Sequence, residues 1–334
     1  GHILVYAFEI LMQIYESYGY SQRDAAISIV ENNIFGLDID NRAFQLAYFA
    51  VMMKARQYNR RILSGEIKCK IYAIQESNTI NRDQLKYFGY GMSDFERNSA
   101  LNQIENLLDT MCDAKEYGSI LIIENVNWLL ITNFVKNYDI SGQMTIDTIG
   151  LDDTQKRLIQ LVRIAEVMSQ KYDVVVTNPP YLSSARFSPK LSYYVKNKYV
   201  EVKSDLSMVM FKRVLDGFVA KNGFVSFITT SSWMFLRSFE AIREEVINNY
   251  QIESIVDFGT ELFDGKVGHN PIVAWVNRNT LPVTRKTSIA IRLVDYCYSR
   301  RDEKPNEFFN MANRYNTLQA NLSKIPGKIG RAHV

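Results

Sequence analysis

The apolar positions of the first 60 residues change from helical to strand spacing and back. Apolar side chains recur at helical intervals over residues 3–18, and a second short helix is predicted at about 21–31 with Ser21 near its start. The run 33–40 indicates a strand that ends in acidic residues, and the Ala- and Met-rich segment 42–58 predicts another helix. This part of the chain is therefore expected to alternate helix, strand, helix.

The next hundred residues combine one strand with a helical insertion. Residues 67–74 alternate as a further strand, but the segment from about 80 to 170 is too long for a simple crossover. Amphipathic helical patterns occupy residues 94–111 and 154–168, and the apolar stretch 117–130 is ambiguous between helix and strand. We expect an inserted helical subdomain.

The second half repeats strand and helix patterns. The expected elements are a helix at 205–220 capped by Ser204, strands at 223–229 and 252–258, a helix at 239–249, a strand at 288–294 and a helix at 306–322. A short, turn-rich link leads into a strand at 271–276, which leaves no room for a helical crossover and predicts antiparallel pairing. The alternation predicts an α/β fold with a mainly parallel sheet.

The most informative stretch is Tyr172–Tyr181, YDVVVTNPPY. Its valines predict a strand buried on both faces, and two prolines directly after it must end the ladder in a rigid turn. Asn178 offers a side-chain acceptor, Pro179 a carbonyl, and Tyr181 a flat ring that can stack on a base. These groups suit an exocyclic amine such as N6 of adenine, although a proline-stiffened loop with Tyr181 in the core is the alternative.

Composition narrows the class of protein. The chain has 334 residues, of which 47% are apolar, and no apolar run approaches a membrane span, so a soluble protein is expected. The three cysteines are isolated from one another and from the three histidines, so neither a disulfide framework nor a metal site is expected. The net charge of +3 is too small to indicate a polyanionic partner by itself. No signal peptide is present, which favours the cytoplasm.

Two acidic residues follow the strand at 33–40. A carboxylate at the carboxyl end of the second strand of a Rossmann-like sheet can accept hydrogen bonds from both ribose hydroxyls. Asp38 is the better candidate for this role and Asp40 the second, while either could instead cap the following helix. We expect Asp40 to be the cap.

The segment after NPPY is basic and aromatic. Its cations are Arg186, Lys190, Lys196, Lys198 and Lys203, and Phe187, Tyr193, Tyr194 and Tyr199 are interleaved with them. Cations for phosphates and rings for an unstacked base are the groups needed to hold DNA with one nucleotide turned out. A solvated surface loop is the alternative.

In motif and context, the NPPY loop resembles the catalytic loop of amino-group DNA methyltransferases. GHILVYAF and NIFGLDIDNRAFQLAYFAVMMKA resemble the region after the glycine-rich cofactor loop in PglX-type adenine-specific methyltransferases of BREX phage-defence systems, relatives of type IIG restriction-modification enzymes. The family's loop reads roughly Asp-Pro-Ala-Cys-Gly-Ser-Gly, and only Gly1 corresponds to it here. The chain is therefore expected to be a fragment whose donor site lacks most of this loop.

The resemblance implies roles for further residues. It implies S-adenosyl-L-methionine as cofactor, with Gly1, Asp38 and Ile39 in contact with it. By position, Gln75 or Glu76 would contact the cofactor's adenine, with a polar exit from the strand as the alternative. Phe263 matches the aromatic residue that stacks on the flipped adenine, with a core phenylalanine as the alternative.

These observations lead to one expected architecture. We expect an α/β, Rossmann-like S-adenosylmethionine-dependent methyltransferase sheet with a helical insertion. Residues 1–277 would form the methyltransferase core, 278–326 the start of a C-terminal target-recognition region, and 327–334 a tail that does not continue the family pattern.

The predicted function is site-specific N6-methylation of adenine in DNA. Asn178, Pro179, Pro180 and Tyr181 would form the catalytic loop, and Arg186, Lys190, Lys196 and Lys198 would contact DNA. The partners are then double-stranded DNA with a flipped adenine and other defence-system proteins. Protein glutamine methylation, RNA adenine methylation and a non-catalytic DNA-binding or scaffold module are the alternatives.

Overall fold

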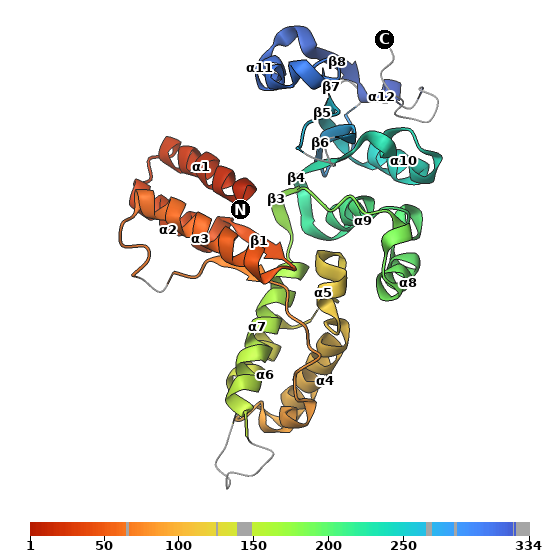
Figure 1. The fold of residues 1–334 in the computed structure, drawn as a ribbon. Helices are drawn as coiled ribbons and strands as arrows, with labels where there is room; N and C mark the ends of the chain where they lie inside the picture. Colours follow the sequence, from red (N-terminus) through yellow and green to blue (C-terminus); the bar gives the residue numbers. More distant parts are fainter. Residues whose placement is uncertain are drawn as a thin grey trace. The chain divides into compact units, whose positions relative to one another are not determined.

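The computed structural model describes residues 1–64, 67–124, 126–138, 149–264, 269–283, 286–322 and 324 (Figure 1). The chain forms two units, Gly1–Ser169 and Gln170–Val334. The predicted tail at 327–334 lies outside the described residues. Within the described ranges, no helix is both long and apolar enough to cross a membrane.

The first unit begins with helices packed on a pair of strands. Its first elements are α1 (His2–Ser17), α2 (Gln22–Ser28), β1 (Phe35–Asp38), α3 (Asn41–Tyr58) and β2 (Lys70–Ala73). β1 and β2 pair in parallel along their whole length. Buried residues of the three helices and β2 share one core, among them Phe8, Met12, Ala26, Val51 and Ile71. The predicted order of helix, strand and helix is confirmed, and Ser21 caps α2 by accepting a hydrogen bond from the backbone N–H of Asp24.

The remainder of the first unit is helical. It contains α4 (Asp94–Thr110), α5 (Ala114–Tyr117), α6 (Trp128–Lys136) and α7 (Leu151–Ser169). α6 packs against both α4 and α7, and Ser93 and Glu96 form a capping box that begins α4. The predicted amphipathic helices are therefore present. The ambiguous stretch 117–130 contains a 3₁₀ turn, Gly118–Ile120, and the start of α6.

The second unit contains a mixed sheet of six strands in the described part of the chain. Three of its five strand pairings are antiparallel, so the prediction of a mainly parallel sheet is wrong for this unit. The strands are β3 (Tyr172–Thr177), β4 (Val219–Thr230), β5 (Gln251–Gly259), β6 (Ile272–Arg278), β7 (Thr287–Arg292) and β8 (Arg314–Leu318). Their order is β3-β4-β6-β5-β7-β8. β3 is parallel to β4, and β7 is parallel to β5. β6 is antiparallel to both β4 and β5, as predicted from its short connection.

The helices of the second unit differ from expectation at two places. The α-helices of this unit, in the described part of the chain, are α8 (Pro189–Lys198), α9 (Leu206–Arg213), α10 (Glu240–Asn249), α11 (Lys304–Phe309) and α12 (Gln319–Leu322). The cap of α9 is Asp205 and not Ser204, because the Asp205 carboxylate accepts the Ser207 backbone N–H at 2.8 Å. The regular helix ends at Arg213, and a π-helical turn, Val214–Phe218, leads into β4.

The single helix predicted at 306–322 is wrong. The segment folds as α11, a 3₁₀ turn, strand β8 and α12. β8 forms because its backbone pairs antiparallel with β7, a long-range partner that local helical spacing does not reveal. β7 and β8 thus extend the sheet of the second unit, and the assignment of residues 278–326 to a recognition region stays a prediction.

Candidate active site

The NPPY turn begins where β3 leaves its sheet. β3 ends at Thr177, whose register partner on the parallel strand β4 is Phe227. Asn178 and Pro180 are exposed, whereas Pro179 is buried. Because neither proline can donate a backbone hydrogen bond, the ladder stops here, as the sequence predicts. The turn is thus held by a strand on one side and by a buried proline within it.

The prediction that β3 is buried on both faces is wrong. Val174 is 60% exposed and Val176 is 46% exposed. β3 stands at one end of the strand order, and among the described strands its partner is β4 alone. An apolar run indicates a strand, but burial depends on what tertiary neighbours cover it.

A hydrogen bond within the turn fixes the amide of Asn178. The Tyr181 hydroxyl donates to Asn178 Oδ1 at 2.8 Å and lies 3.4 Å from the carbonyl oxygen of Ile228. Burial raises the pKa of Tyr181 to about 12, so its hydroxyl keeps the proton that it donates. The arrangement orients Oδ1 as the acceptor of an exposed amide beside an aromatic ring.

Backbone hydrogen bonds close the loop that follows the turn. The Ser184 N–H donates to the Ser204 carbonyl, and the Leu206 N–H donates to the Leu182 carbonyl, both at 2.9 Å. The segment between these pairs contains α8, so the loop that carries α8 starts and ends beside the NPPY turn. Residues far apart in sequence are thereby placed at one site.

Strand directions place Phe263 at the same sheet edge as Asn178. β4 and β5 are both antiparallel to β6, so β3, β4 and β5 share one direction. Phe263 is half-buried and lies shortly after the end of β5 at Gly259. The carboxyl ends of these strands therefore bring Asn178 and Phe263 to a common edge. Its stacking role stays a prediction.

The cations predicted to contact DNA are exposed. Arg186, Lys190, Lys196 and Lys198 all have solvent-accessible side chains. Leu191 and Val195 are the buried residues that anchor α8, and Ser188 caps the helix by accepting the Leu191 N–H at 3.1 Å. Of the interleaved aromatics, Tyr193 is exposed while Tyr199 is buried in the core. Lys190, Lys196 and Lys198 are therefore carried by a capped, anchored helix.

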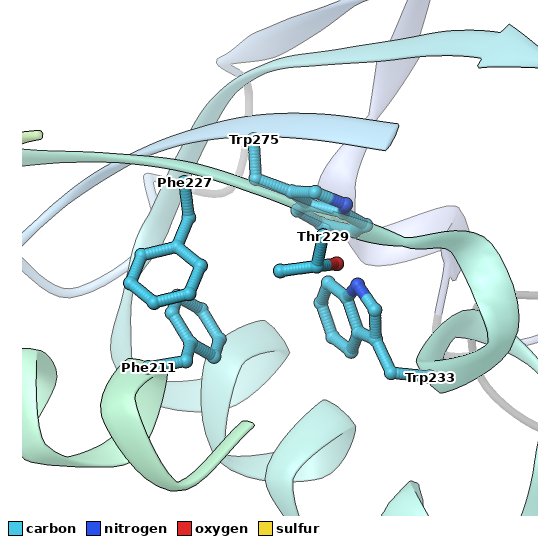
Figure 2. A pocket seen from close by; sticks show the side chains of 5 residues that line it. All are labelled: Phe211, Phe227, Thr229, Trp233 and Trp275. Atoms are coloured by element: carbon cyan, nitrogen blue, oxygen red, sulfur yellow. The ribbon is translucent and has the colours of Figure 1, made fainter. Parts of the chain in front are cut away.

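Sequence reasoning overlooked the segment after β4. Residues 231–239, SSWMFLRSF, leave the sheet at the same edge, and Trp233 anchors them. Figure 2 shows Trp233 facing Trp275 of β6, with Phe211, Phe227 and Thr229 beside them. The two indole rings lie 4.5 Å apart between centroids. The sequence signal that could have identified this segment is a pair of serines followed by a tryptophan directly after a strand.

The pocket in Figure 2 is packed core and not a ligand site. It has no room for a water-sized molecule between its five lining side chains. Phe211 lies 5.0 Å from Phe227 and 5.7 Å from Trp233, measured between ring centroids. This aromatic cluster therefore gives rigidity to the carboxyl end of β4.

The predicted cofactor residues lie in the first unit, mostly at one edge of its strand pair. Asp38 ends β1, and its register partner Ala73 ends β2, so Asp38, Ile39, Gln75 and Glu76 follow adjacent parallel strands. Asp38 and Ile39 are exposed, and Gln75 and Glu76 are half-buried. The Glu76 carboxylate accepts the Lys115 N–H at 3.2 Å, and the Gln75 amide donates to the Ala73 carbonyl at 3.1 Å.

Gly1 lies at the start of α1. Its carbonyl accepts the Val5 N–H at 3.1 Å, and a Cβ added to it would lie 3.6 Å from Ala47 of α3. An added side-chain atom at Gly1 would thus make ordinary van der Waals contact with α3. Its contact with a cofactor stays a prediction.

Asp40 is the helix cap that the sequence predicts. Its Oδ1 accepts the backbone N–H groups of Arg42 at 2.6 Å and Ala43 at 3.3 Å, which begins α3. Asp38 Oδ1 accepts the Asp40 N–H at 2.9 Å. The two carboxylates therefore accept different backbone N–H groups, and the contact of Asp38 with a ligand stays a prediction.

Over the described ranges, no group of three or more His, Cys, Asp or Glu side chains is arranged to hold a metal ion.

Comparison with known families gives a match over most of the chain. The sequence model of the Eco57I restriction-modification methylases matches residues 32–263. This region includes the strand pair of the first unit, the NPPY turn, the basic segment and Phe263.

Two curated relatives match almost all of the chain. It is 35% identical to the adenine-specific methyltransferase PglX of Lacticaseibacillus casei (strain Zhang) and 33% identical to the adenine-specific methyltransferase BrxX of Escherichia coli O9:H4 (strain HS). Each match covers 98% of this chain but only 27% and 28% of the respective relative. The chain thus spans little more than a quarter of their length. The resemblance to PglX-type enzymes is confirmed.

Among solved structures, the fold is similar to a nuclease-deletion mutant of the type ISP restriction-modification enzyme LlaGI in complex with a DNA substrate mimic. The TM-score is 0.50 at 13% identity, and the match covers 95% of this chain and 23% of that one. At this level of identity, the likeness shows the fold alone. It agrees with the α/β methyltransferase fold expected from the sequence.

Proposed function

The chain belongs to the Eco57I restriction-modification methylase family, and on that premise we propose that it is the methyl-transfer core of an adenine-specific DNA methyltransferase. The enzyme would act within a restriction-modification or phage-defence system. The observation that carries the proposal is the exposed Asn178 amide, whose Oδ1 is oriented by the Tyr181 hydroxyl at 2.8 Å.

The acceptor groups of the turn suit the N6 amine of adenine. A carbonyl oxygen has two lone pairs, so Asn178 Oδ1 can keep the hydrogen bond from Tyr181 and still accept one hydrogen of the amine. The Pro179 carbonyl would accept the other hydrogen. Holding both hydrogens turns the nitrogen lone pair toward the methyl donor and removes the cost of orienting it during the reaction. The ring of Tyr181 would stack on the base.

The carboxyl edge of β1 and β2 suits S-adenosyl-L-methionine. Asp38 is exposed and can accept hydrogen bonds from a ribose, and Gln75 or Glu76 would contact the adenine ring. Ile39 would give apolar contact, and Gly1 would lie beside the bound group. When bound, the cofactor supplies an activated methyl group on a sulfonium ion.

Double-stranded DNA is the proposed partner. An adenine inside a duplex cannot reach Asn178 until it is flipped out of the stack. Exposed Arg186, Lys190, Lys196 and Lys198 would neutralise phosphates on either side of that base. Phe263 would contact the face of the adenine opposite Tyr181.

The test is methyl transfer from labelled S-adenosylmethionine to unmethylated DNA by the protein that carries this chain. Asn178→Ala should lower the transfer rate by at least ~10²-fold, because alignment of the amine supplies much of the catalysis. Cofactor binding, measured by calorimetry, should not change. Asn249→Ala is the matched control, since Asn249 is exposed on α10 just before the amino end of β5. Equal rates for the Asn178→Ala variant and the unaltered protein would refute the proposal.

A further inference from the structure

The segment after β4 carries two exposed apolar residues, Phe235 and Leu236, which we call the tip. The order and direction of β3 and β4 place this segment next to the NPPY turn. β3 and β4 run in parallel with Thr177 opposite Phe227, and the Tyr181 hydroxyl reaches the Ile228 carbonyl at 3.4 Å. β4 ends at Thr230, two residues beyond Ile228. The residues that follow β4 therefore emerge beside the groups proposed to receive the target base.

This segment is anchored at both ends of its tip. Trp233 and Met234 before the tip, and Phe239 after it, are buried. Trp233 packs in the aromatic cluster with Trp275 (Figure 2). The Ser231 N–H donates to the Pro271 carbonyl at 2.9 Å, and the Leu236 N–H donates to the Ser232 carbonyl at 3.0 Å. The tip cannot collapse onto the core without breaking these contacts.

A buried arginine holds the backbone of the tip. Arg243 of α10 is 1% exposed, and its Nη1 lies 2.6 Å from the carbonyl oxygens of both Trp233 and Leu236. A buried guanidinium requires acceptors, so these two carbonyls are bound tightly to it. The chain between them is therefore preorganised.

Apolar side chains on this frame are partly exposed. Phe235 is 40% exposed and Leu236 is 44% exposed, and Arg237 and Ser238 beside them are also exposed. What distinguishes these two side chains from other exposed apolar residues is the backbone beneath them, which the buried Arg243 holds in place. The turn Val200–Val202, which follows the basic helix α8, packs against Arg237–Phe239. The tip and the cations of α8 therefore belong to one region of the second unit.

We propose that Phe235 and Leu236 form a wedge that enters the DNA base stack beside the flipped nucleotide, while Arg237 contacts a phosphate. Apolar wedges that fill a gap between base steps are a known way to keep a duplex distorted, and a cation beside the wedge complements the backbone charge. This wedge rests on the proposed function, because it requires a DNA partner. It explains why a partly exposed apolar tip is held rigidly beside an amine-binding turn.

The test compares two duplexes that differ at one position. One carries a single abasic site opposite thymine, and the other carries an adenine·thymine pair there. A wedge enters the abasic gap without the cost of unpairing, so the unaltered chain should bind the abasic duplex more tightly in fluorescence anisotropy at low salt. The double variant Phe235→Ala/Leu236→Ala should reduce this preference about fivefold or more, with little change in affinity for the paired duplex.

Leu281→Ala is the matched control. Leu281 is 72% exposed and follows β6, which is antiparallel to β4, so it lies toward the opposite end of the sheet. This variant should keep the full preference. Since the altered side chains are exposed, the melting temperatures of all variants should agree.

The outcomes separate the wedge from the proposed function. A double variant that keeps the preference, or an unaltered chain that binds both duplexes equally, overturns the wedge and leaves the DNA partner standing. An unaltered chain that binds neither duplex overturns both.

Discussion

At Asn178, the side-chain amide carries one acceptor and two donor hydrogens, so its orientation decides what it can bind. The Tyr181 hydroxyl donates to the oxygen at 2.8 Å, and this hydrogen bond holds the amide with Oδ1 toward Tyr181. Tyr181 thus has two separable parts. Its ring offers a stacking face, and its hydroxyl positions the neighbouring amide.

Removal of the hydroxyl alone separates these two parts. Tyr181→Phe should lower the rate of methyl transfer about fivefold to tenfold, the equivalent of one ordinary hydrogen bond, because Asn178 is no longer held. Affinity for DNA should stay the same, since the ring is kept. Kinetics and anisotropy on the same preparation would measure both.

Tyr193→Phe is the control for this change, because Tyr193 is an exposed tyrosine of α8. It should alter neither quantity. An unchanged transfer rate in Tyr181→Phe would show that the hydroxyl does not position the amide.

At the scale of elements, the chemistry depends on where strands and helices end. Asp38 and Asp40 are two residues apart, yet one ends a strand and the other begins α3. Parallel pairing of β1 with β2 places Asp38 beside the residues that follow β2. The Asp40 carboxylate caps the helix, whereas the Asp38 carboxylate accepts the Asp40 N–H and is predicted to contact the cofactor.

A pair of substitutions tests this division. Asp40→Ala should lower the free energy of unfolding by about 1 kcal/mol through loss of the cap. Its effect on S-adenosylmethionine affinity should be smaller than the effect of Asp38→Ala. Asp38→Ala should do the reverse, weakening cofactor binding with the smaller change in stability. Denaturant unfolding and calorimetric titration of both variants would measure the two effects, and an identical pattern in both would contradict the assignment.

Half-buried Tyr181 and buried Tyr250 link the stability of the second unit to alkaline pH. Burial raises the pKa of Tyr181 and Tyr250 to about 12, compared with about 10 in an unfolded chain. The folded state therefore keeps these protons more tightly than the unfolded state. Their contribution is fully present below pH ~10 and is lost as the pH rises toward ~12.

Thermal unfolding should show this dependence directly. Ionisation of Tyr181 and Tyr250 should leave the melting temperature unchanged up to pH ~10 and should lower it as the pH rises toward ~12. Tyr250→Phe should make the fall shallower, whereas Tyr193→Phe should not. A slope that Tyr250→Phe leaves unchanged would show that this side chain does not contribute.

At the scale of the whole molecule, the positions of the charged residues say more about binding partners than the small net charge does. The net charge is +3, but the segment after NPPY concentrates exposed cations on and around α8. Such a face attracts a phosphate backbone by release of counterions, and the strength of the attraction depends on salt.

Neutralising part of this face should therefore change the salt dependence. The double variant Lys196→Ser/Lys198→Ser should reduce the slope of log affinity for DNA against log salt by about 1 to 2. Lys221→Ser is the control, because Lys221 is exposed near the amino end of β4. Salt-independent binding of the unaltered chain would exclude a DNA-phosphate interface.

Much of the fold could be predicted from local pattern. Helical spacing located α1, α3, α4, α7 and α10, and a short link predicted the antiparallel direction of β6. Two errors arose where distant residues decide the outcome. β8 forms by pairing with β7, and the exposure of Val174 and Val176 depends on which parts of the chain cover the faces of β3.

The sequence by itself determined the chemistry that this protein can offer. Residue types fix which atoms donate and accept, and two prolines after a strand fix a rigid turn, so NPPY and the acidic pair were identified from local information. Only the tertiary structure decided which groups meet. The shared edge of Asn178 and Phe263 and the approach of the Tyr181 hydroxyl to the Ile228 carbonyl depend on strand order, because it brings together residues that are distant in the chain. The arginine-held tip after β4 depends on the burial of Arg243.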